Sequence, residues 1–374
     1  MDEAKFSSPI LYQSRHGSFT LYDIPASISL GEFGSDAQSW HVKSIAALEI
    51  PYRVPEGKPE AAVTSVDAQL LEAAERGLTD IAAHFGGPWC LKRYSCSDEH
   101  DTQFLDEYKE LINNLTAMAN FGPQDTIHLS EDTNLSLAEI YNTCIRNTSS
   151  HLVKLTLIEN GRVYLIPEHS TFILGPISLT RETLLLAVPG LLPKSAPYFD
   201  FVVIDPPWPN RSAIRKAAYN TDQAIRKLLR QLPIRQILAI NGLLGIWVTN
   251  KDAYRNMLGE IFRYWGVKIE AEWIWIKTTT GGEPVTNIQS SWRKPWEVLF
   301  LARRSQSSQM EVTRRVIAAV PDLHSRKPNL RVLIEPLLPQ PCNALEIFAR
   351  NLTPGWWAWG DEAIKYNDAE CWAN

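Results

Sequence analysis

Four consecutive apolar residues, Phe201 to Ile204, run directly into the tetrapeptide Asp205-Pro206-Pro207-Trp208. A short apolar run of this kind is typical of a buried strand. The strand must end at the prolines, because they lack the N–H that a sheet requires. In open α/β sheets, ligands bind at the carboxyl ends of the strands. The sequence therefore predicts an α/β fold with Asp205 and Trp208 at a ligand-binding edge.

The tetrapeptide is suited to hold a planar amine. An ionised Asp205 only accepts hydrogen bonds, and the carbonyls of Pro206 and Pro207 are further acceptors. The indole of Trp208 can stack on a flat ring. Since a nucleobase amine offers two N–H donors and a π face, these four residues are the candidate catalytic residues. The alternative is an ordinary strand-ending turn, because Asp and Pro are common in turns.

Such a site fits methylation of an adenine amine. This amine is a weak nucleophile because its lone pair is delocalised into the ring. Acceptors about 3 Å away can hold both N–H groups, and alignment with an activated methyl group then lowers the barrier. Asp205 would also stabilise the positive charge that develops on the nitrogen. A base inside a duplex must first be flipped out, so we expect an unpaired substrate.

The second half of the chain alternates strand and helix patterns. Strands are predicted at 243–248, 267–276, 297–302 and 344–349, and helices at 212–232, 252–265 and 329–338. This alternation is typical of a parallel or mixed sheet with helices on both faces. A loop rich in Pro and Gly, 188–197, precedes the first strand. We therefore expect an accessory region at 1–195 and a catalytic domain at 196–374.

The first half has a different pattern. Apolar residues recur at helical spacing over 64–86 and 102–119. Residues 152–166 alternate apolar and polar types around Asn160-Gly161, which predicts a β-hairpin. We expect an α+β accessory region, helical over 1–150 and with a β-hairpin part over 151–195.

Charge is distributed unevenly along the chain. Residues 1–199 carry a formal net charge of −11 and residues 200–374 one of +6, and eleven of the thirteen tryptophans lie in the second part. Basic groups among aromatic ones suit phosphate contacts and base stacking, so we expect a nucleic acid as partner. A Trp-rich core under solvated Arg and Lys is the alternative. No stretch is long and apolar enough to span a bilayer, and the scattered Cys and His residues lack metal-binding spacing.

Beyond the tetrapeptide, residues 198–367 resemble the MT-A70 family of adenosine methyltransferases, in the class whose catalytic motif precedes the cofactor-binding strand. The matching segments are Asp205–Trp208, Leu244–Asn250, Trp273–Thr278, His324–Pro328, Glu346–Asn351, Pro354–Trp356 and Trp359–Glu362. The residues after Trp208 and the segment Lys294–Glu297 are similar to the methyltransferase-like protein 4 branch of this family.

The resemblance implies a Rossmann-like class I methyltransferase domain of permuted (β-class) strand order, with S-adenosylmethionine as cofactor. Lys327 would reach the cofactor carboxylate, Arg350 and Asn351 the ribose, and Asp361 and Glu362 the adenosine end. Asp361 departs from the Asn usual at its position. The residues assigned to the cofactor are Ile204, Asp205, Lys327, Phe348, Arg350, Asn351, Asp361 and Glu362. Those assigned to the substrate are Trp208, Asn210, Arg211, Tyr219, Lys277, Arg293, Lys294, Trp296 and Glu297.

The branch is associated with N6-methylation of 2′-O-methyladenosine in U2 spliceosomal RNA and with adenine methylation of DNA. The expected function is methyl transfer to the N6 amine of adenosine in RNA, at that U2 nucleotide, with DNA as the alternative. A non-catalytic, nucleic-acid-binding subunit of another methyltransferase and an enzyme that methylates protein glutamine are further alternatives. We expect a monomer rather than an obligate heterodimer. Its expected location is the nucleus, with the cytoplasm as a second one.

Overall fold

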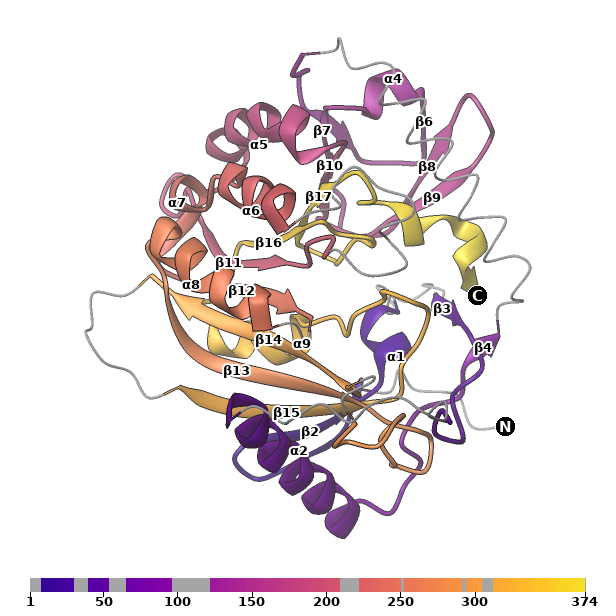
Figure 1. The fold of residues 1–374 in the computed structure, drawn as a ribbon. Coiled ribbons are helices and arrows are strands. Elements are labelled where there is room, and N and C mark those ends of the chain that lie inside the picture. Colours follow the sequence, from indigo (N-terminus) through magenta and orange to yellow (C-terminus); the bar gives the residue numbers. More distant parts are fainter. Residues whose placement is uncertain are drawn as a thin grey trace.

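The computed structural model describes residues 8–29, 40–53, 65–95, 122–208, 222–249, 252–290, 294–304 and 312–373. A 12-stranded, mostly parallel sheet forms its centre (Figure 1). Across the sheet the order is β1 (Ile10–Gln13), β2 (Phe19–Tyr22), β15 (Thr313–Ala319), β13 (Lys268–Lys277), β14 (Trp296–Arg303), β12 (Leu238–Val248), β11 (Phe199–Ile204), β16 (Ala344–Ile347), β17 (Trp357–Gly360), β10 (Thr171–Leu174), β7 (Cys144–Asn147) and β5 (Ile127–Leu129). The predicted α/β class is confirmed at this level.

The central strand β11 is buried on both faces. Val202 and Ile204 pack in one core and Phe201 and Val203 in the other. This burial explains the unbroken apolar run, because a strand covered on both sides has no polar face. Its neighbours β12 and β16 are both parallel to it, so the three strands end at the same edge.

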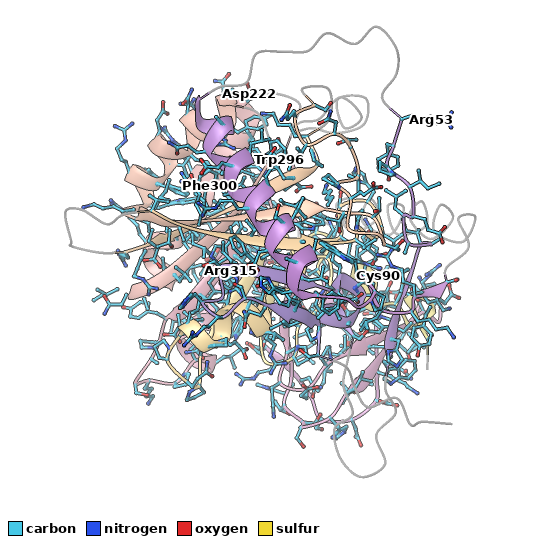
Figure 2. All side chains as sticks on the ribbon, turned by 90° about the horizontal axis from the view of Figure 1, so that it is seen from below. Arg53, Cys90, Asp222, Trp296, Phe300 and Arg315 are labelled. Carbon is cyan, nitrogen blue, oxygen red and sulfur yellow. The ribbon has the colours of Figure 1, made fainter. Side chains whose placement is uncertain are left out.

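Helices cover each face of the sheet. One face packs against α2 (Ser65–His84), α5 (Ile177–Leu191), α6 (Asp222–Gln231), α7 (Ile234–Ile237) and α8 (Asp252–Trp265). Figure 2 shows α2 lying across the sheet when viewed from below. Gly77 permits this contact, since a Cβ there would lie 2.8 Å from the side chain of Val316 in β15. The other face packs against α1 (Ile24–Ile28) and α9 (Arg331–Ile334).

Local sequence signals explain where α8 ends. Gly266 has a φ of 74°, which glycine adopts without steric cost. Its N–H donates to Arg263 O, and the next N–H, of Val267, donates to Phe262 O at 3.0 Å. This pair of bonds is the Schellman motif, which satisfies the last carbonyls of a helix.

Two small sheets complete the fold. The predicted hairpin is confirmed, as β8 (Val153–Leu157) pairs antiparallel with β9 (Val163–Ile166), and β6 (Thr133–Leu135) joins them. In the second sheet, β3 (His41–Ser44) lies between the C-terminal β18 (Trp372–Ala373) and β4 (Tyr94–Ser95). The remaining short elements are α4 (Leu137–Ile140), η2 (Glu335–Leu337), η3 (Lys365–Asn367) and η4 (Ala369–Cys371). In the described segments, no helix has the length and apolar character needed to cross a membrane.

Several predicted elements differ from the structure. The loop expected at 188–197 begins inside α5, which continues through Pro189 to Leu191. The helix expected at 329–338 is shortened to α9 and the 3₁₀ turn η2, with Pro336 inside that turn. The described part of residues 1–150 contains strands β1 to β7 beside its helices, so it is not mainly helical. The amphipathic pattern at 102–119 lies outside the described residues.

The central sheet takes strands from both sides of the expected boundary at 195/196. Strands β1 and β2 form one edge, and β10, β7 and β5 form the other, although all five precede residue 196. The C-terminal strands β16 and β17 lie between β11 and β10. The boundary therefore does not separate two sheets, and a division into two folding units stays a prediction.

Candidate active site

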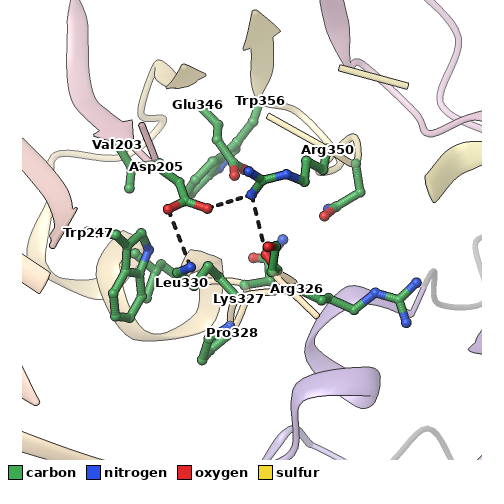
Figure 3. A pocket seen from close by; sticks show the side chains of 13 residues that line it. Val203, Asp205, Trp247, Arg326, Lys327, Pro328, Leu330, Glu346, Arg350 and Trp356 are labelled. Carbon is green, nitrogen blue, oxygen red and sulfur yellow. Dashed lines mark hydrogen bonds and ion pairs between the residues drawn. The ribbon is translucent and has the colours of Figure 1, made fainter. Parts of the chain in front are cut away.

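Asp205 follows the last residue of β11 and faces a pocket at the carboxyl edge of the sheet (Figure 3). Its side chain is buried, and the free volume of the pocket beside it is about 30 Å³. This volume is enough for a water molecule or two and is far below that of a typical small-molecule site. The lining includes Asp205, Trp247, Lys327, Glu346, Arg350 and Asn351. Asp205 thus lies at the carboxyl edge of the sheet in a pocket, and its catalytic role stays a prediction.

Both carboxylate oxygens of Asp205 are paired with cations. Nη1 of Arg350 donates to Oδ2 at 2.6 Å, and Nζ of Lys327 lies 3.4 Å from Oδ1. Arg350 also donates through Nη1 to the carbonyl oxygen of Ser325 at 3.3 Å. The structure therefore brings Asp205, Lys327 and Arg350 together from three separate segments, although the first and the last are 145 positions apart in sequence.

The ion pairs continue on both sides of Asp205. On one side, Glu297 accepts from Lys277 at 2.6 Å and pairs with Lys327 at 3.1 Å. On the other side, Glu362 pairs with Nε of Arg350 at 3.0 Å and with Lys365 at 2.6 Å. The result is one chain of alternating charge along the pocket, in the order Lys277, Glu297, Lys327, Asp205, Arg350, Glu362 and Lys365.

This network shifts the pKa values of its members. Burial by itself would raise the pKa of Glu297, but Lys327 and Lys277 outweigh it and lower the pKa to about 2. Burial would lower the pKa of Lys327 and Arg350, yet the neighbouring Asp205 raises both. These groups therefore keep their charges at neutral pH despite their partial burial.

Glu346 belongs to the pocket, although the sequence analysis assigned it no role. It lies on β16, directly opposite Val203 of β11, and lines the pocket beside Asp205. Burial, followed by repulsion from Asp205, raises its pKa to about 7. A strongly perturbed carboxyl group in a pocket is a sign of a functional site. The available signal was a carboxylate inside the apolar run that forms β16.

The backbone around the pocket is strained at two non-glycine residues. Ser325 and Phe348 have φ values of 71° and 62°. A side chain at Gly360 would place its Cβ 3.1 Å from the Cα of Phe348, so the end of β17 packs directly on this turn. Strained backbone of this kind persists only where surrounding contacts fix it, and it is common at functional sites.

Trp208 differs from its expected role as a base-stacking plate. Only 7% of it is exposed. Its Nε1 donates to the carbonyl oxygen of Trp247 at 2.7 Å, and its ring stacks on Tyr254 with centroids 4.6 Å apart. Since both the ring and its N–H are already engaged, Trp208 fixes the strand end here. Pro206 also differs in part, because its carbonyl already accepts from the Trp208 N–H at 2.7 Å, while Pro207 is exposed.

The other predicted site residues fall into three groups. Asn351 lines the pocket, and Asp361, whose pKa burial raises, follows β17 beside Glu362. Trp296, predicted for the substrate, and Ile204, predicted for the cofactor, are both buried in the core, and Lys294 lies 5.9 Å over the Trp296 ring. Asn210, Arg211, Tyr219 and Arg293 lie outside the described residues.

Comparison with known proteins agrees with this geometry. The sequence profile of the MT-A70 family matches residues 199–362. The N6-methyladenosine RNA methyltransferase MTA1 of Pyricularia oryzae is 36% identical over 97% of this chain and 96% of its own length. The N(6)-adenine-specific methyltransferase METTL4 of Homo sapiens is 32% identical over 72% of this chain and 57% of its own length. A DNA N6-methyl methyltransferase of Caenorhabditis elegans is 34% identical over 53% of each chain. The predicted resemblance is confirmed, and the chain belongs to the MT-A70 methyltransferase family.

Proposed function

We propose that this chain transfers a methyl group from S-adenosylmethionine to the N6 amine of adenosine in RNA. One observation carries the proposal: Asp205 lies in the same pocket as Lys327 and Arg350, at the carboxyl edge of the central sheet. An acceptor for an amine and two cations for an anionic ligand thus line one pocket. The position of the C-terminal strands β16 and β17 between β11 and β10 supports a permuted strand order.

The charges of the pocket fit a methionine-derived cofactor. Lys327 would hold its carboxylate, Arg350 and Asn351 its ribose, and Glu362 and Asp361 its adenosine end. Glu346 fits a cationic ligand, because burial and repulsion from Asp205 raise its pKa and a bound positive charge would offset that repulsion. The bound cofactor would supply an electrophilic methyl group on a sulfonium.

The chain's own contribution to the reaction is acceptance and alignment. Asp205 would accept an N–H of the target amine and stabilise the positive charge that develops on nitrogen. The Pro206 carbonyl has a second lone pair and would accept the other N–H. Trp208, locked by Trp247 and Tyr254, would keep this turn rigid, and alignment of this kind supplies much of the rate.

RNA is favoured over DNA by the extent of the likeness. The relative named as an RNA methyltransferase aligns with nearly the whole chain, whereas the relative named for DNA aligns with about half. Within RNA, we propose the 2′-O-methyladenosine of U2 spliceosomal RNA as the substrate, which would place the enzyme in the nucleus. A monomer rather than an obligate heterodimer is proposed as well, since this chain itself supplies Asp205, Lys327 and Arg350.

The test uses the full chain, a labelled methyl donor and matched oligonucleotides. Adenosine RNA, its 2′-O-methyl form and single-stranded DNA of one sequence would be compared with native protein and Asp205→Asn. We expect native activity to be highest on the RNA forms and the variant to lose at least about 100-fold in kcat. Asp200→Asn is the matched control, because Asp200 lies on the same strand away from the pocket and accepts from the Asn343 N–H.

Three results would count against the proposal. Activity that survives in Asp205→Asn would remove the role of the carboxylate. A native protein that binds no S-adenosylmethionine in calorimetry would favour a non-catalytic nucleic-acid-binding subunit. Transfer to a glutamine peptide instead of an oligonucleotide would favour the amide-methylating alternative.

A further inference from the structure

The segment between β15 and α9, residues 320–330, carries Lys327 and is fastened to the N-terminal part of the chain. The hydroxyl of Tyr22 donates to the carbonyl oxygen of Asn329 at 2.7 Å. The Asn329 N–H donates to Oγ of Ser27 at 3.1 Å. Tyr22 is fully buried at the end of β2, and Ser27 lies in α1. One end of the segment therefore rests on residues that lie some 300 positions earlier.

Arg326 fastens the middle of the same segment. Its Nη1 donates to the Lys43 carbonyl at 2.9 Å and pairs with Oδ2 of Asp322 at 2.8 Å. Both side chains of the pair are almost completely buried, at 1% and 0% exposed. Ser44 donates to the same Asp322 oxygen at 3.2 Å, and the Arg326 guanidinium lies 4.5 Å over the ring of Tyr366.

The pair is not arranged for maximum stability. Among the described residues, Nε and Nη2 of Arg326 and Oδ1 of Asp322 make no hydrogen bond although they are buried. Arg93 approaches Oδ1 only to 4.0 Å. A buried ion pair with unsatisfied atoms is often no more stable than apolar residues of the same size. Its presence therefore points to a requirement for a defined geometry.

The geometry that it fixes is that of the pocket. Lys327 follows Arg326 directly, and Figure 3 shows the two side chains pointing in opposite directions, with Lys327 toward Asp205 and Arg326 away from the pocket. The preceding residue, Ser325, has the strained φ of 71°. Contacts on the far side of the segment are needed to hold such a conformation, and Arg326 makes them.

We propose that Arg326 is a positioning residue for the cofactor pocket: anchored on Asp322 and the Lys43 carbonyl, it holds the backbone from which Lys327 reaches Asp205 and Glu297. The inference rests on the proposed function, in which Lys327 binds the carboxylate of S-adenosylmethionine. It also gives the N-terminal part a role in cofactor binding. Trp89 of that part makes a comparable contact with the loop after Lys277, since its ring lies against Gly282.

The test removes both charges together, because removing one alone would leave the other buried and unpaired. Asp322→Asn combined with Arg326→Gln is titrated as full chain in a calorimeter against S-adenosylmethionine and against 5′-methylthioadenosine. The second ligand has the adenosine and sulfur but no carboxylate. We expect a loss of about ten-fold or more in affinity for S-adenosylmethionine. We expect a change of less than about two-fold for 5′-methylthioadenosine, which makes no bond to Lys327.

Two further variants keep the test decisive. Glu270→Gln with Arg303→Gln is the matched control, since that pair, at 2.8 Å, bridges β13 and β14 at the end remote from Lys277. It should leave both affinities unchanged. Arg326→Lys keeps the charge and should show a smaller loss, again confined to S-adenosylmethionine.

The outcomes separate the two claims. Equal losses for both ligands would show a general collapse of the pocket and would overturn the positioning role, as would unchanged affinity for S-adenosylmethionine. If the double variant does not fold, an Arg326→Lys variant with native affinity for both ligands would overturn it as well. A native chain that binds neither ligand would overturn the proposed function, and this inference with it.

Discussion

Replacing Glu346 by glutamine should stabilise the protein at alkaline pH while weakening cofactor binding. Glu346 is a partly buried carboxyl group whose pKa is raised from 4.5 to about 7, first by burial and then by repulsion from Asp205. Glutamine has nearly the same shape and no charge to bury. Binding sites commonly contain groups that favour ligand binding and lower the stability of the fold.

The magnitude follows from the raised pKa. The folded state binds the Glu346 proton more tightly than the unfolded state, so stability is highest below pH 4.5 and is lost as pH rises through about 7. At about 1.4 kcal/mol per pKa unit, the difference between 4.5 and 7 amounts to about 3 kcal/mol. Because the side chain is partly open to water, screening reduces this figure, and we expect about 1–2 kcal/mol.

Urea unfolding of native protein and Glu346→Gln at pH 5 and pH 8 measures this effect. The two proteins should have similar free energies of unfolding at pH 5, and the variant should exceed the native protein at pH 8. Glu131→Gln, at an exposed position, should show no such dependence on pH. Equal stabilities at both pH values, or a variant that is less stable at pH 8, would refute the reasoning.

Three more predictions concern the pocket and its support. Glu297→Gln should lose about 1–3 kcal/mol of unfolding free energy at pH 7, measured in urea titrations. Native Glu297 stabilises the fold above pH 4.5 and ceases to do so as pH falls through about 2. The difference in unfolding free energy between variant and native protein should therefore vanish at about pH 2. Trp208→Ala should lose about 3–5 kcal/mol in the same assay because it empties a buried site, whereas Trp208→Phe should lose about 1–2 kcal/mol with its bond to Trp247. Gly282→Ala should lower the melting temperature, since its φ is 86° and a Cβ would lie 2.5 Å from the Trp89 ring, while Gly281→Ala, whose Cβ meets only Thr279 at 3.7 Å, should not.

Elements with a strong local signal were predictable from the sequence. The helix over 64–86 corresponds to α2, the helix over 252–265 to α8, and the Asn160-Gly161 hairpin to β8 and β9. In each case, a long stretch of regularly spaced apolar residues or a specific turn-forming pair determines the element locally, without the rest of the chain.

Elements defined by distant partners were not predictable. The strand β17 is only Trp357-Ala358-Trp359-Gly360, and β15 follows a segment with no strand signal. Both form strands because they pair with strands on each side: β17 lies between β16 and β10, and β15 lies between β13 and β2. Periodicity contains no information on such pairing, which also explains why β10 was not assigned to the catalytic sheet.

The site itself was predictable in its charged residues and less so in its aromatic ones. Asp205, Lys327 and Arg350, which the resemblance assigned to one site, meet in one pocket, and their roles toward cofactor and substrate stay predictions. Trp208 and Trp296 were expected to contact a base and are buried instead. An indole is both apolar and able to stack, so sequence alone does not distinguish a core residue from a base platform.

Lys327 and Arg350 pair with Asp205 and would also bind the proposed cofactor, and this affects the order in which cofactor and nucleobase bind. Lys327 and Arg350 occupy one acceptor site on each oxygen of Asp205, so an incoming amine shares the carboxylate with both cations. If Lys327 instead binds the cofactor carboxylate and Arg350 the ribose, each contact draws a cation away from Asp205. The Asp205 carboxylate, which should accept one adenine N–H, is then a stronger acceptor once the methyl donor is in place. An exchange of ion pairs inside the pocket would thus favour cofactor binding before the nucleobase.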